Sequence, residues 1–147
     1  MSAATDKDRV ATRMKIVDEH VERENLHDAD GVTKTWGSTV RFSFPAAGEQ
    51  HEGFDNVRAL YAELFEAFPD IRFEELQRHI ASDAIVLEVV LSGTHQDMWR
   101  GIPATGKRIS LQTCAIFVFD EHDALVEEKV YLDGAAMLVQ LGLLPPQ

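Results

Sequence analysis

The sequence predicts a single α+β domain in which helices come first and a mostly antiparallel sheet follows. Apolar residues recur at helical spacing up to Phe68 and follow strand-like patterns from Ile71 onward. The 147 residues suit one domain over 1–147, because a chain of this length buries most of the surface that it exposes when unfolded.

Three helices are expected in the first half of the chain. The first follows Thr5, whose side chain can cap it, and Asp6 and Asp8 lie near the positive end of its dipole. Its apolar stripe has helical spacing and consists of Val10, Met14, Val17 and Val21. A short second helix is expected over 27–37 and a third over 55–68, where Pro69 ends it.

Five strands and a closing helix complete the prediction. Gly- and Pro-rich connections and polar turns separate the expected strands, which lie at 39–44, 71–81, 85–95, 108–119 and 124–133. The closing helix is expected at 135–144. A curved sheet of this kind must cover its apolar face, and three helices packed into the curve would do so, leaving a cavity at the open end.

The strand at 85–95 is apolar on both faces. One face carries Ile85, Leu87, Val89 and Leu91, and the other carries Val86 and Val90. Only one face can meet the helices of the same domain. The second face, on which Glu88 and Ser92 are polar exceptions, therefore predicts contact with another copy of the chain; an edge that is apolar on both sides is the alternative.

Charge and composition exclude several classes of function. With 25 acidic and 14 basic side chains, the net charge of −11 opposes binding to nucleic acid or to an anionic membrane surface. The single cysteine, Cys114, cannot form an internal disulfide, and no apolar run has the length of a signal peptide core or a membrane span. We therefore expect a cytoplasmic protein.

The last expected strand carries a polar face. Alternation places Glu127, Lys129, Tyr131 and Asp133 on one side, and Val126, Glu128, Val130 and Leu132 on the other. A polar row that faces water needs no explanation, whereas one that faces the inside of the domain indicates chemistry.

Three stretches together resemble the SnoaL-like polyketide cyclases of the nuclear transport factor 2-like superfamily. They are "FPDIRFEE", "SGTHQDMWRGIPATGKRISL" and "EEKVYLDGAAMLVQLGLLP", and the likeness runs from about Val10 to Pro145. The resemblance implies a cone-shaped α+β barrel with a ligand pocket inside, a homodimer through the convex sheet face, and ring closure by an aldol reaction without metal or organic cofactor.

The resemblance also implies site residues. Asp133 matches the aspartate that serves as general acid/base near the end of the last strand, which would turn the polar face into the pocket. Tyr131, His95 and Lys129 are the donors available to a developing enolate oxygen. The family's glutamine and histidine on the preceding strand correspond to Ala115 and Phe117, which cannot hydrogen-bond through their side chains. An aspartate that only caps the closing helix is the alternative for Asp133.

Further pocket candidates come from the helices and one loop. Trp36, Tyr61, Phe65 and Trp99 can form an aromatic pocket or pack in the core, and Trp99 suits a lid because it lies in a connection. His20 flanks the apolar stripe and can face the cavity, and Asn25 matches an asparagine common in the family. His20, Glu24 and His27 share one side of the first helix, but the two histidines lie about 10 Å apart along it, so no metal site is expected.

These observations favour a cofactor-free acid/base enzyme that acts on a small hydrophobic carbonyl compound, by cyclisation, isomerisation or dehydration. A protein of the same fold that binds a hydrophobic ligand, or serves as a scaffold, without catalysis is the main alternative. An epoxide hydrolase would need two inward aspartates bridged by an arginine, and the sequence does not place such a trio.

Overall fold

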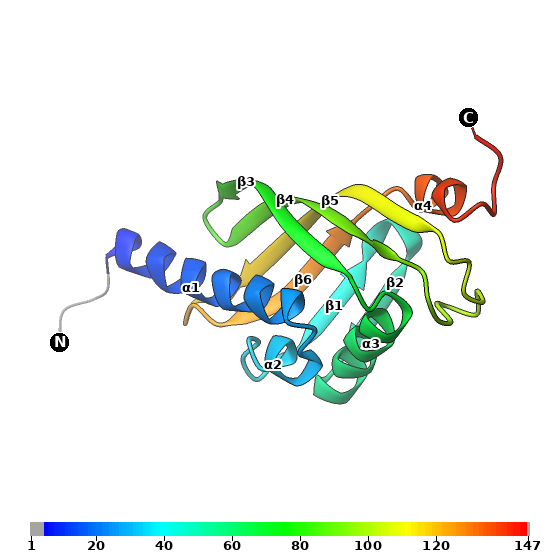
Figure 1. Ribbon diagram of the computed structural model, residues 1–147. Helices are drawn as coiled ribbons and strands as arrows, with labels where there is room; N and C mark the ends of the chain where they lie inside the picture. Colours follow the sequence, from blue (N-terminus) through cyan, green and yellow to red (C-terminus); the bar gives the residue numbers. More distant parts are fainter. Residues whose placement is uncertain (1–4, 147) are drawn as a thin grey trace.

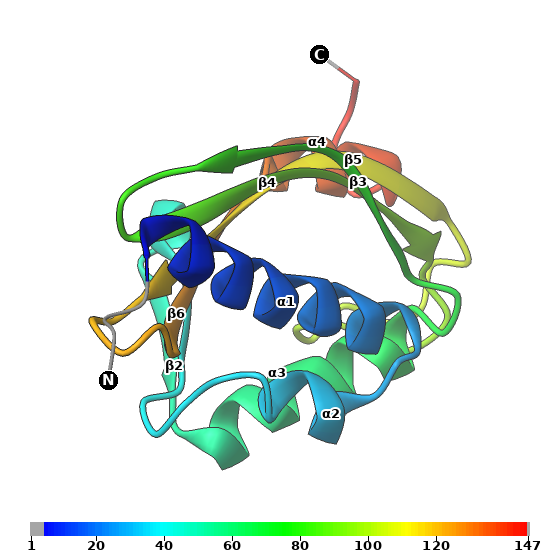
Figure 2. The ribbon, with the colours of Figure 1, turned by 90° about the vertical axis from the view of Figure 1, so that its left-hand side faces the viewer.

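A computed structural model describes residues 5–146 as one curved six-stranded sheet with helices on its concave side (Figures 1 and 2). The helices are α1 (Asp6–Asn25), α2 (Ala29–Thr33), α3 (Phe54–Ala67) and α4 (Gly134–Gln140), with a short 3-10 turn η1 (Pro45–Ala47). The strands are β1 (Arg41–Phe44), β2 (Glu49–Glu52), β3 (Arg72–Ile80), β4 (Ala84–Thr94), β5 (Arg108–Phe119) and β6 (Leu125–Tyr131). In Figure 2, α1 lies in the hollow of the sheet, and α2 and α3 lie on the side opposite β3, β4 and β5. No helix within 5–146 is long and apolar enough to cross a membrane.

The α+β fold class is confirmed. The strands lie in the order β2-β1-β6-β5-β4-β3, and every neighbouring pair is antiparallel except β1 and β6. Strand β6 therefore lies between β1 and β5, near the middle of the curved sheet. Its inward side chains point into the centre of the hollow that α1 and α3 cover.

Strand β2 is the one strand that the sequence analysis placed in a loop. All four of its residues are polar and none is β-branched, so the local sequence does not favour a strand. The strand forms because η1 and Gly48, which has a left-handed φ of 67°, turn the chain back to pair with β1. Tertiary pairing thus decides its conformation.

Helix α1 begins as predicted, but its buried side differs from the apolar stripe. Thr5 accepts a hydrogen bond from the Asp8 backbone N–H at 3.1 Å, and Asp8 returns the contact as in a capping box. The buried side consists of Arg13, Val17, His20 and Glu24. Three of these four side chains are polar, so their burial requires partners elsewhere in the fold.

Arg13 finds its partners at the turns of the sheet. Its guanidinium donates to the Asp123 carboxylate at 2.8 Å and to the Ser82 carbonyl at 3.0 Å. These contacts tie the first half of α1 to the β3–β4 and β5–β6 turns. They fix α1 across the sheet, and this in turn fixes where His20 and Glu24 lie.

The outer face of β4 and β5 keeps the second apolar surface predicted from the sequence. Val86, Val90, Ile116 and Val118 are only half-buried there.

We expect a second copy of the chain to cover this face, so that the protein sediments as a dimer. Val90→Lys should weaken the dimer about 100-fold or more, because the new ammonium group, although it lies opposite Glu74 of β3, would lose its hydration when a second copy covers this face. Ala59→Lys, on the exposed side of α3, is the control, and a monomeric wild type would contradict the expectation.

Candidate active site in the concave cavity

The hollow of the sheet contains a narrow cavity with an almost entirely apolar wall. Its wall comes from α1, α3, β1, β3, β4, β5, β6 and α4, with contributions from Phe42, Leu60, Leu87, Leu91, Leu111 and Phe117. The centre of a water molecule can move through ≈ 80 Å³ of it. Polar side chains in the wall are few: Thr113 lies apart, and Glu24, Tyr61 and Glu128 belong to one buried group.

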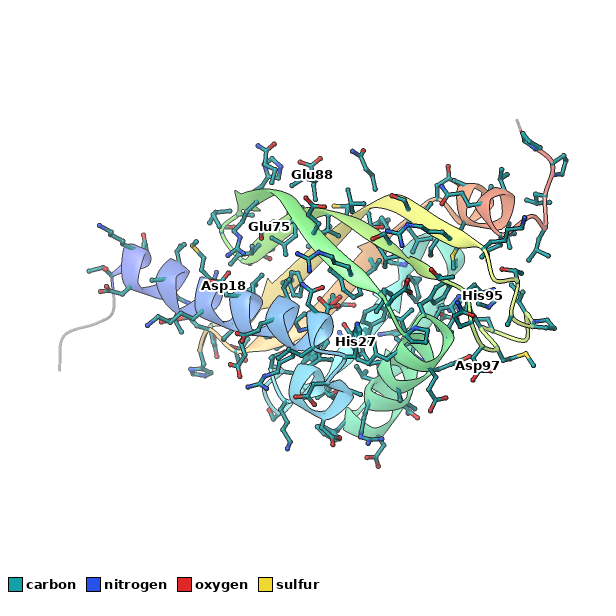
Figure 3. The ribbon with its side chains drawn as sticks, viewed as in Figure 1. Asp18, His27, Glu75, Glu88, His95 and Asp97 are labelled. Carbon is teal, nitrogen blue, oxygen red and sulfur yellow. The ribbon has the colours of Figure 1, made fainter. Side chains whose placement is uncertain are left out.

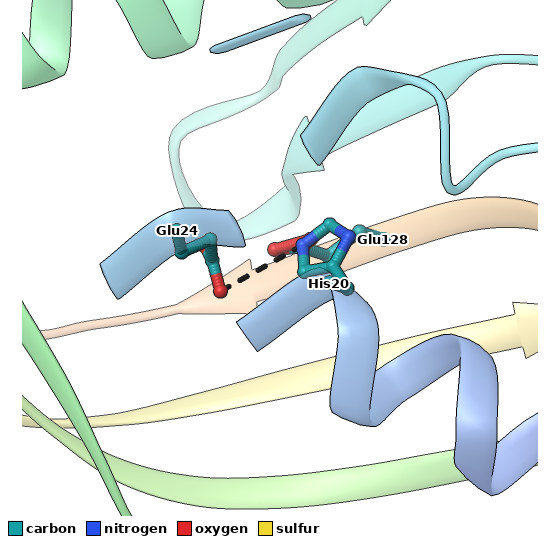
Figure 4. A group of neighbouring side chains, drawn as sticks. All are labelled: His20, Glu24 and Glu128. Atoms are coloured by element: carbon teal, nitrogen blue, oxygen red, sulfur yellow. Dashed lines mark ion pairs between the residues drawn. The ribbon is translucent and has the colours of Figure 1, made fainter. Parts of the chain in front are cut away.

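That group is completed by His20, and we call His20, Glu24, Tyr61 and Glu128 the buried tetrad (Figure 4 shows three of its members). The His20 Nε2 atom lies 2.8 Å from Glu128 Oε2 and 3.8 Å from Glu24 Oε1. The Tyr61 hydroxyl lies 3.1 Å from Glu128 Oε2 and 3.2 Å from His20 Nε2. The four side chains are 0%, 5%, 2% and 2% exposed, so water does not screen these contacts.

Three separate elements bring the tetrad together. His20 and Glu24 are four residues apart in α1 and therefore lie one above the other on the same side of the helix. Tyr61 comes from α3, and Glu128 comes from the inward face of β6, directly opposite Phe117 of β5. Two aromatic rings pack against the imidazole of His20 with edge-to-face geometry, Trp36 at 5.1 Å and Phe117 at 4.9 Å between ring centroids.

The hydrogen bonds fix which nitrogen of His20 carries a proton. The Thr35 hydroxyl donates its only proton to the Val32 carbonyl at 2.7 Å. At His20 Nδ1, 2.8 Å away, Thr35 can therefore only accept, so Nδ1 must be the donor. Nε2 is therefore the ring nitrogen that contacts the Glu24 and Glu128 carboxyl groups. When His20 is an imidazolium, Nε2–H donates to Glu128 in a short charge-assisted hydrogen bond.

Burial and charge together set the protonation of the tetrad. Burial raises the pKa of Glu24 to about 8; His20 opposes this shift and Glu128 reinforces it. Burial alone would lower the pKa of His20, but the two carboxylates outweigh it, so the pKa is raised. Burial and the same carboxylates hold the pKa of Tyr61 well above its usual value. Near neutral pH Glu24 is therefore protonated, and an imidazolium at His20 paired with the Glu128 carboxylate across their 2.8 Å contact would leave the tetrad with no net charge.

The same residues offer a donor set for a cation. One ligand atom each from His20, Glu24 and Glu128 lies within 4.8 Å of the others, and imidazole with carboxylates suits divalent transition metals. Protons on Glu24 and His20 can balance the negative charge of the two carboxyl groups without a metal ion. The expected absence of a metal therefore stays a prediction.

Four of the sequence candidates lie at this site. Tyr61, Phe117 and Trp99 line the cavity, and His20 lies behind its polar end. Ala115, which takes the place of one polar residue of the family, also lies in the wall beside Thr113. The ionisable groups of the cavity therefore come from α1 and β6, with the Tyr61 phenol from α3, and β5 contributes only the hydroxyl group of Thr113.

Four other candidates lie outside the cavity wall. Asn25 exchanges two hydrogen bonds with the backbone of Phe73, at 3.0 and 2.8 Å, and so anchors the end of α1 to β3. Trp36 packs on His20, and Phe65 packs on Tyr61 with ring centroids 5.8 Å apart. His95 is fully buried and stacked on Phe68, and its Nδ1 accepts from the Thr105 backbone N–H. These four side chains support the site or the loop near it.

The predicted orientation of β6 is wrong. Tyr131 and Asp133 lie on the outer side, where Tyr131 is 39% exposed, whereas Glu128, Val130 and Leu132 line the cavity. The apolar face packs inward because it buries more apolar surface, and it carries Glu128 with it. Asp133 caps α4 by accepting from the Ala136 backbone N–H at 3.0 Å, which is the alternative that the sequence left open.

Glu24 and Glu128 are members of the site that the sequence did not reveal. Glu128 had one signal: it is the only charged residue on the apolar face of its strand. Glu24 had its four-residue spacing from His20, a spacing that in the sequence suggested only a metal site. Neither signal identifies Tyr61 and the β6 carboxylate as partners, because that contact depends on how α3 packs across the sheet.

Comparisons with solved structures support the fold. AclR from Streptomyces galilaeus is 26% identical with a TM-score of 0.77, and the match covers 92% of this chain and 98% of AclR. TsrD from Streptomyces laurentii is 22% identical with a TM-score of 0.78, over 91% of this chain and 97% of TsrD. SalBIII is an epoxide hydrolase/cyclase-like enzyme in pyran ring formation in the polyether salinomycin. It is 13% identical with a TM-score of 0.72, over 86% of this chain and 95% of SalBIII.

A comparison with curated proteins finds no match. The family model for SnoaL-like polyketide cyclase matches residues 10–141, which is most of the chain and contains the whole buried tetrad. The chain belongs to the SnoaL-like polyketide cyclase family.

Proposed function

We propose that this protein is a cofactor-free acid/base enzyme that moves a proton next to the carbonyl group of a small apolar compound. The observation that carries the proposal is the buried tetrad at one place in an otherwise apolar cavity wall. Two buried carboxyl groups with opposite protonation are what such chemistry needs, since one accepts a proton while the other donates one. Asp133 takes no part in this proposal, because it lies outside the cavity.

The proposed step conserves charge within the tetrad. The Glu128 carboxylate takes the proton from the carbon next to the carbonyl, so that a C–H bond breaks and an O–H bond forms. The protonated Glu24 gives its proton to the carbonyl oxygen, which yields the enol. The His20 imidazolium remains paired while the negative charge moves from one carboxylate to the other. The burial of the four side chains favours such a step, because few solvent dipoles have to reorganise around them.

The enol is shared by three reaction types. It can attack a second carbonyl and close a ring, take its proton back at another carbon, or expel a hydroxyl group. Ring closure agrees with the family to which the chain belongs. The substrate decides among the three reactions.

One observation favours a non-catalytic binding protein instead. The polar groups of the tetrad hydrogen-bond one another, as a purely structural network would. In that case the cavity would hold an apolar ligand through its wall alone. The two candidates differ in whether a bound ketone exchanges protons.

Proton exchange can be measured before the natural substrate is known. We expect the wild-type protein to incorporate deuterium beside the carbonyl of cyclohexanone or acetophenone in deuterium oxide, followed by nuclear magnetic resonance. The rate should fall as the pH rises through about 8, because Glu24 then loses the proton that it donates. Binding of both ketones without exchange at any pH would support the binding protein and contradict the enzyme.

A further inference from the structure

A second apolar hollow lies directly outside the cavity. We call it the vestibule; η1, the connection between β4 and β5, the end of β6 and α4 surround it. Residues that line it without lining the cavity include Ala46, Ala47, Arg100, Ile102, Leu138 and Leu141. The centre of a water molecule can move through ≈ 430 Å³ of the vestibule, against ≈ 80 Å³ of the cavity. Among residues 5–146, Arg100 is the only charged residue in its wall.

The two spaces share part of their walls. Five residues line both of them: Phe44, Trp99, Val130, Leu132 and Met137. Phe44, Val130 and Met137 belong to β1, β6 and α4, and Leu132 lies in the two-residue link from β6 to α4, so the sheet and the closing helix hold all four. Trp99 alone comes from the connection between β4 and β5, so it is the part of the partition that can move with least disturbance of the fold.

Trp99 is carried by a tight turn. Trp99 and Ile102 exchange two backbone hydrogen bonds, at 2.9 and 2.8 Å, around Arg100 and Gly101, whose φ angles of 52° and 79° are both left-handed. The base of the connection is fixed: the His95 backbone bonds Lys107 and Gly106 at 2.9 and 2.8 Å. Figure 3 shows His95 and Asp97 at this end of the molecule, beside α3.

The tip of the turn is held from outside. The Arg100 guanidinium forms an ion pair with Glu49 of β2 and lies over the rings of Phe44 and Trp99, at 5.2 and 5.5 Å from their centroids. The Arg100 backbone N–H donates to Glu63 at 3.1 Å. Arg100 and Glu49 are 39% and 31% exposed, and ion pairs at such positions contribute little. Moving the turn would break one backbone hydrogen bond and this half-exposed ion pair, and it would uncover Trp99, which is 7% exposed, so an apolar ligand that covers the indole again favours the movement.

We propose that the cavity and the vestibule are two compartments of one ligand site, and that Trp99 is the movable partition between them. The ligand is an elongated apolar carbonyl compound: its carbonyl end reaches the buried tetrad and its tail passes Trp99 into the vestibule. The cavity alone is too small for such a molecule, whereas both spaces together can hold it. The carbonyl end rests on the proposed function, but the length of the ligand does not.

Straight-chain methyl ketones of increasing length test the proposal by their dissociation constants. Affinity for the wild type should rise about fourfold with each added methylene, and should continue to rise beyond the length that fills the cavity. Ala47→Trp places a large side chain at an exposed position of the vestibule wall, away from the cavity. It should weaken the longest ketone about tenfold or more and leave the shortest unchanged. Ala59→Trp, on the exposed side of α3, is the matched control.

Trp99→Ala gives an independent result. Removal of the partition should speed association of the longest ketone about tenfold or more and leave that of the shortest nearly unchanged. The proposal is overturned if Ala47→Trp leaves the affinity of the longest ketone unchanged, or if wild-type affinity stops rising once the cavity is filled. Glu128→Gln should keep the dependence on chain length. A length dependence without any deuterium exchange would therefore reject the proposed catalysis and retain the two-compartment site.

Discussion

Glu128→Gln is expected to lower the rate of deuterium exchange into cyclohexanone by on the order of 10²–10⁴-fold, the usual contribution of a positioned general base. Glutamine has nearly the same shape as glutamate but cannot accept the proton from carbon. Its amide oxygen can still accept the hydrogen bond from Tyr61, so the cavity wall should keep its form. The dissociation constant of the ketone should therefore change only a few-fold.

Asp133→Asn is the matched control, since it replaces the carboxylate that the family resemblance selected. Asparagine also caps helices well, so the variant should retain both exchange and stability. If Asp133→Asn abolished exchange and Glu128→Gln did not, the buried tetrad would not be the catalytic site. The melting temperature of each variant shows whether lost exchange reflects lost folding.

The fold could be predicted in most parts because local patterns and tertiary packing agree. The β5 strand has the predicted bounds, and one of the two apolar faces of β4, the one that carries Leu87 and Leu91, lines the cavity. In β2, local sequence and structure diverge, since pairing with β1 imposes the strand on a polar segment. A strand can be predicted where the local sequence and the tertiary packing favour the same conformation. A single long-range pairing, such as that of β2 with β1, can impose a conformation that the local sequence does not favour.

The site was harder to predict because alternation separates the faces of a strand without saying which one is inside. For β6 the family resemblance turned the face of Asp133 inward, whereas the larger apolar area of the other face decides the packing. On α1 the buried side contains His20 and Glu24, which a stripe of apolar residues cannot reveal. Buried polar groups depend on partners from distant elements, and these partners follow only from the assembled fold.

The thermal stability of the protein is expected to fall as the pH rises from about 5 to 8. The pKa of Glu24 is about 8 in the folded protein, against an ordinary value of 4.5 that the unfolded chain keeps. Between these values the folded state holds a proton that the unfolded state has released, so each rise in pH favours unfolding. Above about 8, Glu24 is ionised in both states and adds no further change.

His20 acts in the same direction. Its pKa is raised above 6.5 in the folded state, so its contribution is fully present below 6.5 and is lost as the pH rises through the folded value. Paired carboxylates such as Asp123 and Asp70 have lowered pKa values, and their contribution is lost only as the pH falls below about 3.8. The two effects together place the greatest stability between about pH 4 and 5.

Glu24→Gln isolates the buried carboxyl group. The variant cannot ionise at this position, so its melting temperature should change much less between pH 5 and 8 and should exceed that of the wild type at pH 8. One pKa unit corresponds to about 1.4 kcal/mol, so the difference at pH 8 amounts to several kcal/mol, or on the order of 10 °C. Glu22→Gln, at an exposed position of the same helix, should keep the wild-type slope. A wild-type melting temperature that is flat over this range would mean that Glu24 is ionised in the folded protein at pH 5, and then it could not donate a proton to a carbonyl oxygen at neutral pH.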